Sequence, residues 1–441
     1  DNSVAWNSLG GGADFTVAPP GSSSLISGDF SYSQYDITSI ENGGTPSTSG
    51  ITGFNGGLDF TYFLRENDEF KYGIEAIGYG TKFSLGTEVG GTIDQDQNTT
   101  EFGAYFQYKI KEERLIVQPG FRIHRYSSLN ETRFEPRLGA KYIVNEYLRL
   151  KASGGWFSQN LIAANNDRDV VNLFYGFLSG TTGGPSEFRG EELSSNLQTA
   201  THIIAGFEIE LNSKTTVNIE GYIKDFNQIT NLNRNKIYEE APTDRVVEDI
   251  LVSDYIIEQG VAKGLDFLVK YQDRDLYLWL TYSIGKITRD DGITVYAPHF
   301  DRRHNLNFVG TYVFGKDRTW ETSLRYNFGT GFPFTPTQAY YADHPFTTTN
   351  GQVDVAYDYT SENGDFGTLY GDLNTNRLPN YHRVDLSVKK TVEFSKNQIL
   401  EFTAGATNIL NYENVFYFDT QDFKRINQLP IMPTVSVNYS F

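Results

Sequence analysis

The chain has 441 residues, a net charge of −18, no cysteine and 39% hydrophobic residues, fewer than the roughly 45–50% of a typical soluble domain. The missing cysteine excludes disulfide scaffolds, thiolate metal sites and cysteine catalysis, and the acidic balance argues against a nucleic-acid partner. Aromatic residues make up 15% of the chain, which argues against disorder, and no segment reaches the roughly 18 apolar residues of a membrane-spanning helix.

Apolar and polar residues alternate along most of the chain, which predicts β-strands rather than helices. In the last strand, Val435, Val437, Tyr439 and Phe441 share one face, and polar residues occupy the other. In chain order, the predicted strands lie near 4–18, 24–38, 50–65, 70–86, 99–110, 114–126, 132–144, 147–158, 197–211, 215–228, 254–271, 275–287, 300–314, 319–333, 380–393, 398–411 and 430–441. This period gives about 17 strands in a single domain, residues 1–441, and no helix is predicted.

The predicted strands are joined by two kinds of connection. Short charged turns are expected at 66–69, 111–113, 145–146, 212–214, 272–275, 315–318 and 395–397. Longer polar loops are expected near 38–50, 86–98, 157–196, 228–253, 288–299, 332–380 and 412–429, with the link at 127–131 as the short exception. Short turns on one side and long loops on the other are typical of an outer-membrane barrel. The expected fold class is therefore all-β, a transmembrane antiparallel β-barrel.

An odd number of strands does not suit a bacterial barrel, which as a rule has an even number. With the C-terminus on the short-turn side, the first strand would start outside the cell. The sequence begins at Asp1 without a leader peptide, so we expect a mature chain or part of a longer one. Either the strand count is wrong by one, or N-terminal sequence is missing. We favour the second interpretation, in which sequence before Asp1 supplies the plug and the first strands.

Several segments resemble one family. Residues 296–305 (YAPHFDRRHN) resemble a strand start of TonB-dependent outer-membrane receptors, and residues 329–336 (GTGFPFTP) resemble the exit of the following strand. Residues 257–266 (IEQGVAKGLD), 407–411 (TNILN) and the closing strand after 429–433 (LPIMP) are also similar to that family. The resemblance is greatest to Bacteroidota members with a carboxypeptidase-like N-terminal domain, the SusC-like relatives, and it covers roughly the last 190 residues; the earlier half matches in hairpin rhythm only.

The resemblance implies a 22-stranded barrel in the outer membrane of a Gram-negative bacterium. It also implies a plug inside the barrel, energy coupling through TonB, and insertion by the barrel-assembly machinery. This chain would be the C-terminal portion of that barrel. Missing N-terminal sequence would supply the plug and the TonB contact, and a partner chain is the alternative source of the missing parts. Outer-membrane lipid is the expected surroundings, and a surface lipoprotein is a possible partner.

Mid-strand charges on the polar faces are candidate lumen residues. The residues selected are Glu321, Arg325, Arg383, Asp385, Lys389 and Glu401. They could contact a plug or line the path of a solute. Alternatively, they form a hydrated wall in which opposite charges pair across neighbouring strands, and the pairs Glu321/Arg325 and Arg383/Asp385 suit that alternative.

Aromatic residues in the predicted loops are candidates for contact with a ligand. They are Phe174, Tyr175, Phe332, Phe334, Tyr340 and Tyr341. Packing of loop against loop is the alternative. His299 and His304 flank Asp301, but five residues apart on a strand they fall on opposite faces. We therefore expect no metal site there. The sequence contains no Ser-His-Asp set in a plausible context and no HExxH motif, so we expect no catalytic site, and we expect no cofactor.

Tyr439 and Phe441 end the last alternating strand. We interpret them as the signal that the barrel-assembly machinery recognises, and an ordinary last strand is the alternative. The main functional hypothesis is a TonB-dependent receptor barrel that takes up a bulky solute. The second is a non-transporting barrel subunit that scaffolds an outer-membrane complex with surface lipoproteins, and a soluble adhesin or hydrolase ranks third. The substrate stays open among siderophores, oligosaccharides, peptides and cofactors.

Overall fold

The computed structural model describes most of the chain. The described residues are 3–40, 46–64, 68–86, 92–164, 174, 176–180, 184–185, 187–193, 195–238, 246–343, 348–349, 352–353, 365–395, 398–418 and 424–441. Within them, no helix is both long and apolar enough to cross a bilayer.

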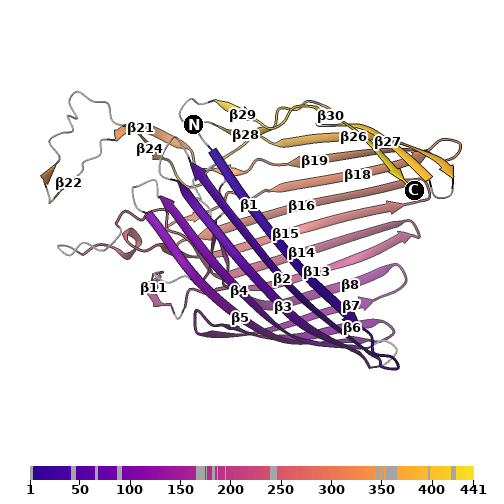
Figure 1. The fold of residues 1–441 in the computed structure, drawn as a ribbon, viewed down its shortest axis with the longest axis horizontal. Coiled ribbons are helices and arrows are strands. Elements are labelled where there is room, and N and C mark those ends of the chain that lie inside the picture. Colours follow the sequence, from indigo (N-terminus) through magenta and orange to yellow (C-terminus); the bar gives the residue numbers. More distant parts are fainter. Residues whose placement is uncertain are drawn as a thin grey trace.

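One antiparallel sheet of 18 strands dominates the fold (Figure 1). Its two-residue strand β17 (Val295–Tyr296) only extends the end of β16, which leaves 17 long wall strands. These are β1 (Ser3–Val17), β2 (Ser24–Ile40), β3 (Ser47–Phe63), β4 (Glu69–Gly86), β5 (Thr92–Lys111), β6 (Leu115–Tyr126), β7 (Glu131–Ile143), β8 (Leu148–Gln159), β13 (Gln198–Asn212), β14 (Thr215–Leu232), β15 (Tyr255–Gln272), β16 (Leu276–Asp290), β18 (His304–Phe314), β19 (Trp320–Gly329), β26 (Tyr381–Ser395), β27 (Gln398–Thr407) and β30 (Met432–Ser440). Each predicted strand corresponds to one of them, so the predicted all-β fold is confirmed.

Each wall strand pairs with the next one along the chain, from β1–β2 to β27–β30. Among the described residues, no pairing joins β1 to β30, so the wall has two edges. With 17 strands that alternate in direction, β1 and β30 run the same way. Figure 1 shows the N-terminus at the end that carries the loops and the C-terminus at the opposite end. We call these the loop end and the turn end.

Small elements lie mostly at the loop end. They are β9 (Ile162–Ala164), β10 (Gly176–Leu178), β11 (Glu187–Phe188), β12 (Glu191–Glu192), the 3-10 helix η1 (Asp249–Leu251), β20 (Pro333–Phe334), β21 (Thr337–Asp343), β22 (Thr348–Thr349), β23 (Gln352–Val353), β24 (Asp365–Tyr370), β25 (Asn376–Arg377), β28 (Val415–Phe418) and β29 (Arg425–Asn427). The helix η1 was not predicted. Two predicted loops, 38–50 and 86–98, are shorter than expected, because β2 to β5 continue into them as paired strands.

The register of the wall separates its two faces. Leu280, Phe308 and Tyr326 stand opposite one another on one face, whereas Asn307 and Asn327 face each other on the other. The apolar face is exposed along the whole wall, for example at Phe30, Phe54, Phe102, Trp156, Ile203, Leu265, Leu324 and Val437. The wall curves so that β1 to β5 lie in front of β13 to β16 (Figure 1). The register places the polar face on the side of the lumen between them.

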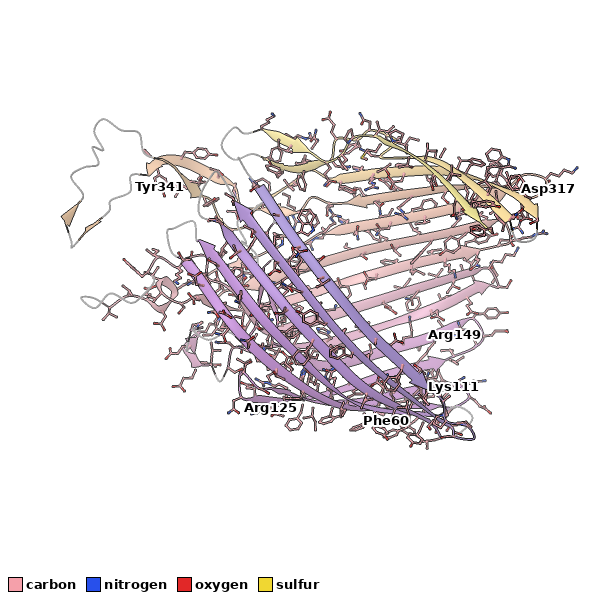
Figure 2. The ribbon with its side chains drawn as sticks, in the orientation of Figure 1. Phe60, Lys111, Arg125, Arg149, Asp317 and Tyr341 are labelled. Carbon is pink, nitrogen blue, oxygen red and sulfur yellow. The ribbon has the colours of Figure 1, made fainter. Side chains whose placement is uncertain are left out.

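Side chains project from both faces of the wall along its full length (Figure 2). Lys111 and Asp317 mark the charged turn end, and Tyr341 marks a hairpin that extends beyond the loop end. An apolar outer band bounded by charged turns is the pattern required of a wall that meets lipid on the outside and water on the inside.

Candidate functional site

The connection between β8 and β13 folds back into the mouth of the wall. Its strands β9 and β10 pair as a hairpin. Strand β10 contacts β3 and β4, whereas β9 contacts β14. Five wall strands, β5 to β8 and β13, separate β4 from β14. The β9–β10 hairpin therefore spans part of the lumen and joins wall segments that are not neighbours.

Hydrogen bonds hold this hairpin to the polar face of the wall. The Phe177 backbone N–H donates to Ser49 Oγ at 3.0 Å. The hydroxyls of Thr81 and Ser179 lie 3.1 Å apart, and both residues are buried. Because a buried hydroxyl without a partner is costly, these contacts fix both the position and the depth of the hairpin.

A hydrophobic cluster surrounds the hairpin at the loop end. Its buried members are Phe83, Ile93, Ile162, Ala164, Leu178, Leu232 and Tyr255, and Leu85 and Phe174 pack against them. They come from β4, β5, β9, β10, β14 and β15, so the cluster closes across the mouth rather than along one strand. Fully burying a large apolar side chain contributes roughly 1.5–3 kcal/mol, so this cluster is a main contribution to the docking of the hairpin.

The connection between β14 and β15 is anchored by buried charges. Glu258 is fully buried and accepts hydrogen bonds from Tyr296 Oη at 2.6 Å, Arg234 Nη1 at 3.3 Å and Arg289 Nη1 at 3.4 Å. Arg234 also pairs with Asp291. Two guanidinium groups thus face two carboxylates, a balance that a buried ionic group requires.

A second anchor joins the same connection to the start of β5. Lys236 is 4% exposed, and its Nζ donates to Asp254 Oδ1 at 2.7 Å and to the Thr92 carbonyl at 2.6 Å. This lysine connects positions 144 residues apart in the sequence, and no local pattern could have indicated it.

The six charges predicted to face the lumen all lie on the polar face of β19, β26 and β27. Lys389 Nζ is 3.3 Å from Glu321 Oε1 and 3.6 Å from Glu401 Oε1. Arg383 Nε donates to Asp385 Oδ1 at 2.8 Å, and Arg325 stands opposite Asp385 in register. The Arg383/Asp385 pair is present.

The expected ion pair between Glu321 and Arg325 is wrong, because Glu321 has a different partner. Glu321 pairs with Lys389, which stands directly opposite in register. Arg325 is four residues further along the same strand, about 13 Å away at roughly 3.3 Å per residue. Glu321 thus pairs across strands, whereas Arg383 and Asp385 pair along one strand.

A denser group of lumenal charges lies on β7, β8, β13 and β14. Arg149 binds Glu208 at 2.9 Å and also pairs with Glu210. Lys151 Nζ lies 2.6 Å from Glu220 Oε1, and Lys141 Nζ lies 3.4 Å from Glu208 Oε1. The alternation of polar residues predicted charges here, but not that the cations and anions would gather on separate neighbouring strands.

The six aromatic residues predicted to contact a ligand do not form one described platform. Phe174 packs 5.9 Å from the Phe83 ring in the mouth cluster, and Tyr175 lies outside the described residues. The Arg302 guanidinium lies 4.1 Å over the ring of Phe332.

The remaining aromatic residues lie elsewhere at the loop end. The ring of Phe334 lies 6.5 Å from that of Phe418. Tyr340 and Tyr341 belong to the β21–β24 hairpin, and Tyr341 is 52% exposed. Loop packing therefore accounts for Phe174 and Phe334, and ligand contact stays a prediction for the set.

The segment 296–305 organises the connection before β18. Asp301 is 1% exposed, and its Oδ1 accepts the backbone N–H of Ile287 at 2.9 Å. Arg377 pairs with the Asp301 carboxylate and donates to its carbonyl oxygen at 3.0 Å. His304 Nδ1 lies 2.8 Å from Tyr282 Oη. The aspartate of this motif is thus a structural anchor between β16 and β25.

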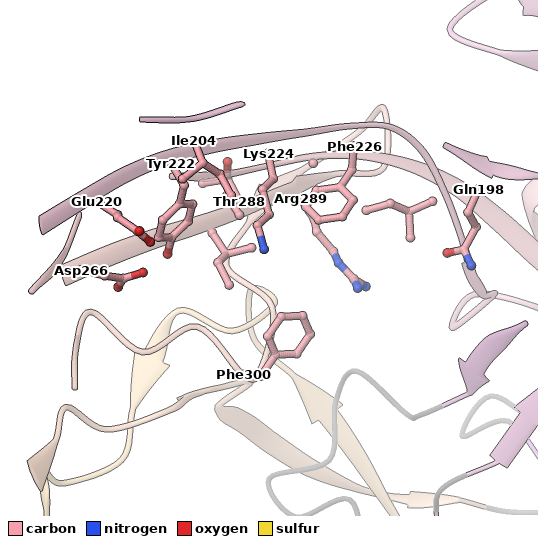
Figure 3. Close-up of a pocket in the computed structure, with 14 residues that line it drawn as sticks. Gln198, Ile204, Glu220, Tyr222, Lys224, Phe226, Asp266, Thr288, Arg289 and Phe300 are labelled. Carbon is pink, nitrogen blue, oxygen red and sulfur yellow. The ribbon is translucent and has the colours of Figure 1, made fainter. Parts of the chain in front are cut away.

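A lumenal pocket of about 520 Å³ lies between the polar face of β13 to β16 and Phe300 (Figure 3). Glu220, Tyr222 and Asp266 gather at one end, and Lys224 and Arg289 point into the pocket further along. A Cβ at position 264 would meet Tyr222 Oη at 2.7 Å, so the absence of a side chain at Gly264 leaves room for the tyrosine ring. Among the described side chains, no group of three or more His, Asp and Glu is arranged to hold a metal ion.

The C-terminal residues Tyr439 and Phe441 lie on the apolar face of the wall edge. Their rings stack with centroids 5.9 Å apart and planes at 26°. Tyr439 is 48% exposed and Phe441 is 93% exposed. The pair is accessible for recognition, and the assembly role stays a prediction.

The sequence matches one protein family. The family described as TonB dependent receptor-like, beta-barrel matches residues 1–409. No curated protein matches the sequence.

Solved structures share the fold at low sequence identity. FpvA of Pseudomonas aeruginosa, solved with heterologous pyoverdines, aligns with a TM-score of 0.63 and 12% identity over 99% of this chain and 56% of that one. The ferric-catecholate import receptor Fiu of Escherichia coli K12 gives 0.64 and 10% over 99% and 64%. The outer-membrane transporter YddB of Escherichia coli gives 0.59 and 8% over 100% and 63%. This chain thus spans less than two thirds of the length of each.

Proposed function

Because this chain belongs to the TonB-dependent receptor-like β-barrel family, we propose that it forms part of the wall of a receptor that imports a bulky solute. The protein is located in the outer membrane of a Gram-negative bacterium, with its apolar face toward lipid. The observation that carries the proposal is the polar lumen narrowed at the loop end by the β9–β10 hairpin. Such a constriction admits a solute selectively, whereas an open pore would not.

The open seam supports a role as part of a larger barrel. Strands β1 and β30 run in the same direction, so only an odd number of further antiparallel strands closes the seam. The exposed edges carry unpaired backbone groups that do not persist in lipid. Sequence outside residues 1–441 would supply the further strands. As the resemblance to SusC-like receptors implies, it would also supply a plug in the lumen and a segment that contacts TonB.

A second candidate function rests on the β21–β24 hairpin. This hairpin projects beyond the loop end (Figure 1) and exposes Tyr341 and Leu369, both at 52%. An exposed aromatic and an exposed aliphatic side chain on a projecting hairpin suit a protein partner such as a surface lipoprotein. The barrel would then serve as a scaffold rather than as an importer.

Solute depletion from the medium distinguishes the two functions. Cells that carry the complete gene, a deletion of the gene, or a defective TonB would be grown in the same rich medium. Untargeted mass spectrometry of the medium would compare which solutes disappear. Import predicts at least one solute whose depletion stops in both mutants. Equal depletion in all three strains, together with a lipoprotein that co-purifies with the intact barrel, would reject import in favour of the scaffold.

A further inference from the structure

The lumenal pocket beside Phe300 has an acidic end. Glu220 and Asp266 stand directly opposite each other in register on β14 and β15, so their Cβ atoms are roughly 4.5–5.5 Å apart. Lys151 neutralises Glu220 at 2.6 Å. Asp266 makes no ion pair with any cation among the described residues. One carboxylate charge therefore remains at this end of the pocket, where it favours a cationic group.

A basic group lies further along the same pocket. Lys224 lies four residues along β14 from Glu220, about 13 Å at roughly 3.3 Å per residue. In the described part of the chain, Lys224 forms no ion pair with a carboxylate, and its Nζ lies 5.6 Å from the Tyr222 ring centroid. Arg289 also lines this part of the pocket, but its guanidinium forms an ion pair with Glu258 at 3.4 Å. One ammonium charge therefore remains here, where it favours an anionic group.

Apolar and aromatic side chains lie between the acidic and the basic group. Tyr222 and Ile204 stand opposite each other in register there, and Phe300 faces the wall strands from the connection before β18 (Figure 3). Phe226 and Ile229 line the pocket beyond Lys224. The pocket volume of about 520 Å³ lies within the roughly 300–1,000 Å³ of small-molecule sites. Its middle section therefore suits an apolar body rather than a hydrated sugar.

We infer that this pocket binds a short zwitterionic peptide, with its amino terminus at Asp266 and its carboxylate at Lys224. An extended chain covers at most about 3.3–3.6 Å per residue, so three to four residues match the separation of the two charges. A free amino acid is too short to reach both ends. A solute with only one charge leaves the other end unpaired, which weakens binding. This inference rests on the proposed import function and names its substrate class.

Binding of capped peptides to the complete protein in nanodiscs tests the assignment. The probe is Ala-Phe-Ala-Ala, measured by isothermal titration calorimetry beside its N-acetylated form and its C-amidated form. We expect each cap to weaken binding by at least tenfold, since each removes one charged contact. Asp266→Asn should abolish the discrimination against the acetyl cap only. Lys224→Met should abolish the discrimination against the amide cap only.

Lys270→Met is the matched control, because Lys270 is another lumenal lysine of this wall but does not line the pocket. It removes the same charge and should leave all three affinities unchanged. Heat-modifiable migration on gels shows that each variant is folded. No binding of the free peptide at millimolar concentration, or equal binding of the free and capped forms, overturns the inference. If TonB-dependent depletion of other solutes persists in that case, import stands and only the peptide assignment fails.

Discussion

The hydroxyl of Ser179, in the connection between β8 and β13, lies 3.1 Å from the hydroxyl of Thr81 on the lumenal face of β4. Ninety-eight residues separate the two in sequence, and both are at most 1% exposed. This contact places a surface connection inside the mouth of the wall. It makes the β9–β10 hairpin part of the lumen rather than a free loop.

Leu178→Ala should loosen this hairpin. Leu178 is 1% exposed within the mouth cluster, and replacing a buried leucine by alanine costs about 2–5 kcal/mol. We expect faster hydrogen–deuterium exchange at 176–180, followed by mass spectrometry. Leu369→Ala, at a 52% exposed leucine, is the control and should leave this segment protected. Equal protection in the two variants would show that the cluster does not hold the hairpin.

Glu258→Ala should destabilise the loop end. Removing this fully buried carboxylate leaves Arg234 and Arg289 without their shared partner, and breaking a buried ion pair costs about 3–5 kcal/mol. Guanidinium unfolding followed by tryptophan fluorescence measures the loss. Glu248→Gln, at an exposed carboxylate, should stay within about 0.5 kcal/mol of the parent protein. A similarly small loss in Glu258→Ala would argue against the anchor.

Leu324→Arg and Ser323→Arg test the two faces of the wall. Leu324 stands opposite Gly310 and Leu386 on the apolar face, whereas Ser323 points into the lumen. An arginine on the lipid face costs about 2–4 kcal/mol near the bilayer centre. We expect Leu324→Arg to lower the urea midpoint in vesicles and Ser323→Arg to change it little. The reverse order would mean that the faces are assigned the wrong way round.

Phe441→Ser tests the predicted assembly signal. The stacked pair Tyr439 and Phe441 ends the wall on the apolar face. We expect several-fold less folded protein in the outer membrane, detected as the heat-modifiable band on gels. Leu429→Ser, at another exposed apolar residue before β30, is the control. Unchanged levels in Phe441→Ser would favour an ordinary last strand.

The turn end carries a pH-sensitive ion pair outside the membrane. Lys214 Nζ lies 2.7 Å from Asp273 Oδ2. The hydrogen bonds from Lys214 and from the Arg274 backbone lower the pKa of Asp273, and Asp273 raises the pKa of Lys214. A carboxyl group whose pKa is lower in the folded state stabilises the protein at pH values above its unfolded pKa. This stabilisation is lost as the pH falls through the folded pKa.

The lysine contributes in the opposite sense. Because its pKa is raised in the folded state, the lysine stabilises the protein at pH values below its unfolded pKa. This stabilisation is lost as the pH rises through the folded pKa. Both contributions are therefore present around neutral pH. Lys214→Met should raise the pKa of Asp273 toward its ordinary value, as measured by carbon-13 NMR of labelled aspartate. Lys316→Met, in another turn, should leave it unchanged, and an unchanged Asp273 in Lys214→Met would refute the pairing.

The wall strands could be predicted from sequence because each needs only its own residues. In a strand, side chains alternate between the faces, and one face must meet lipid. The segment that contains Leu324 and Arg325 shows this alternation directly, and its two faces follow from it. Strand ends followed less closely from the sequence, because β5 begins at Thr92, where the composition still resembles a loop.

The partners within the lumen could not be predicted in the same way. Glu321 was expected to pair with Arg325 but pairs with Lys389. That choice depends on the register between β19 and β26, which are separated in sequence by the long connection at 330–380. No periodic pattern on either strand encodes it.

By itself, the sequence determined the strands, their two faces and the segregation of short turns from long loops, because these follow from local alternation and turn chemistry. Only the tertiary structure decided what fills the mouth. The β9–β10 hairpin, the Glu258 anchor and the pocket between Asp266 and Lys224 join residues from distant strands. Their geometry depends on how far the wall curves and on which side chains that curvature brings together. The pattern of residues along the sequence does not encode this curvature.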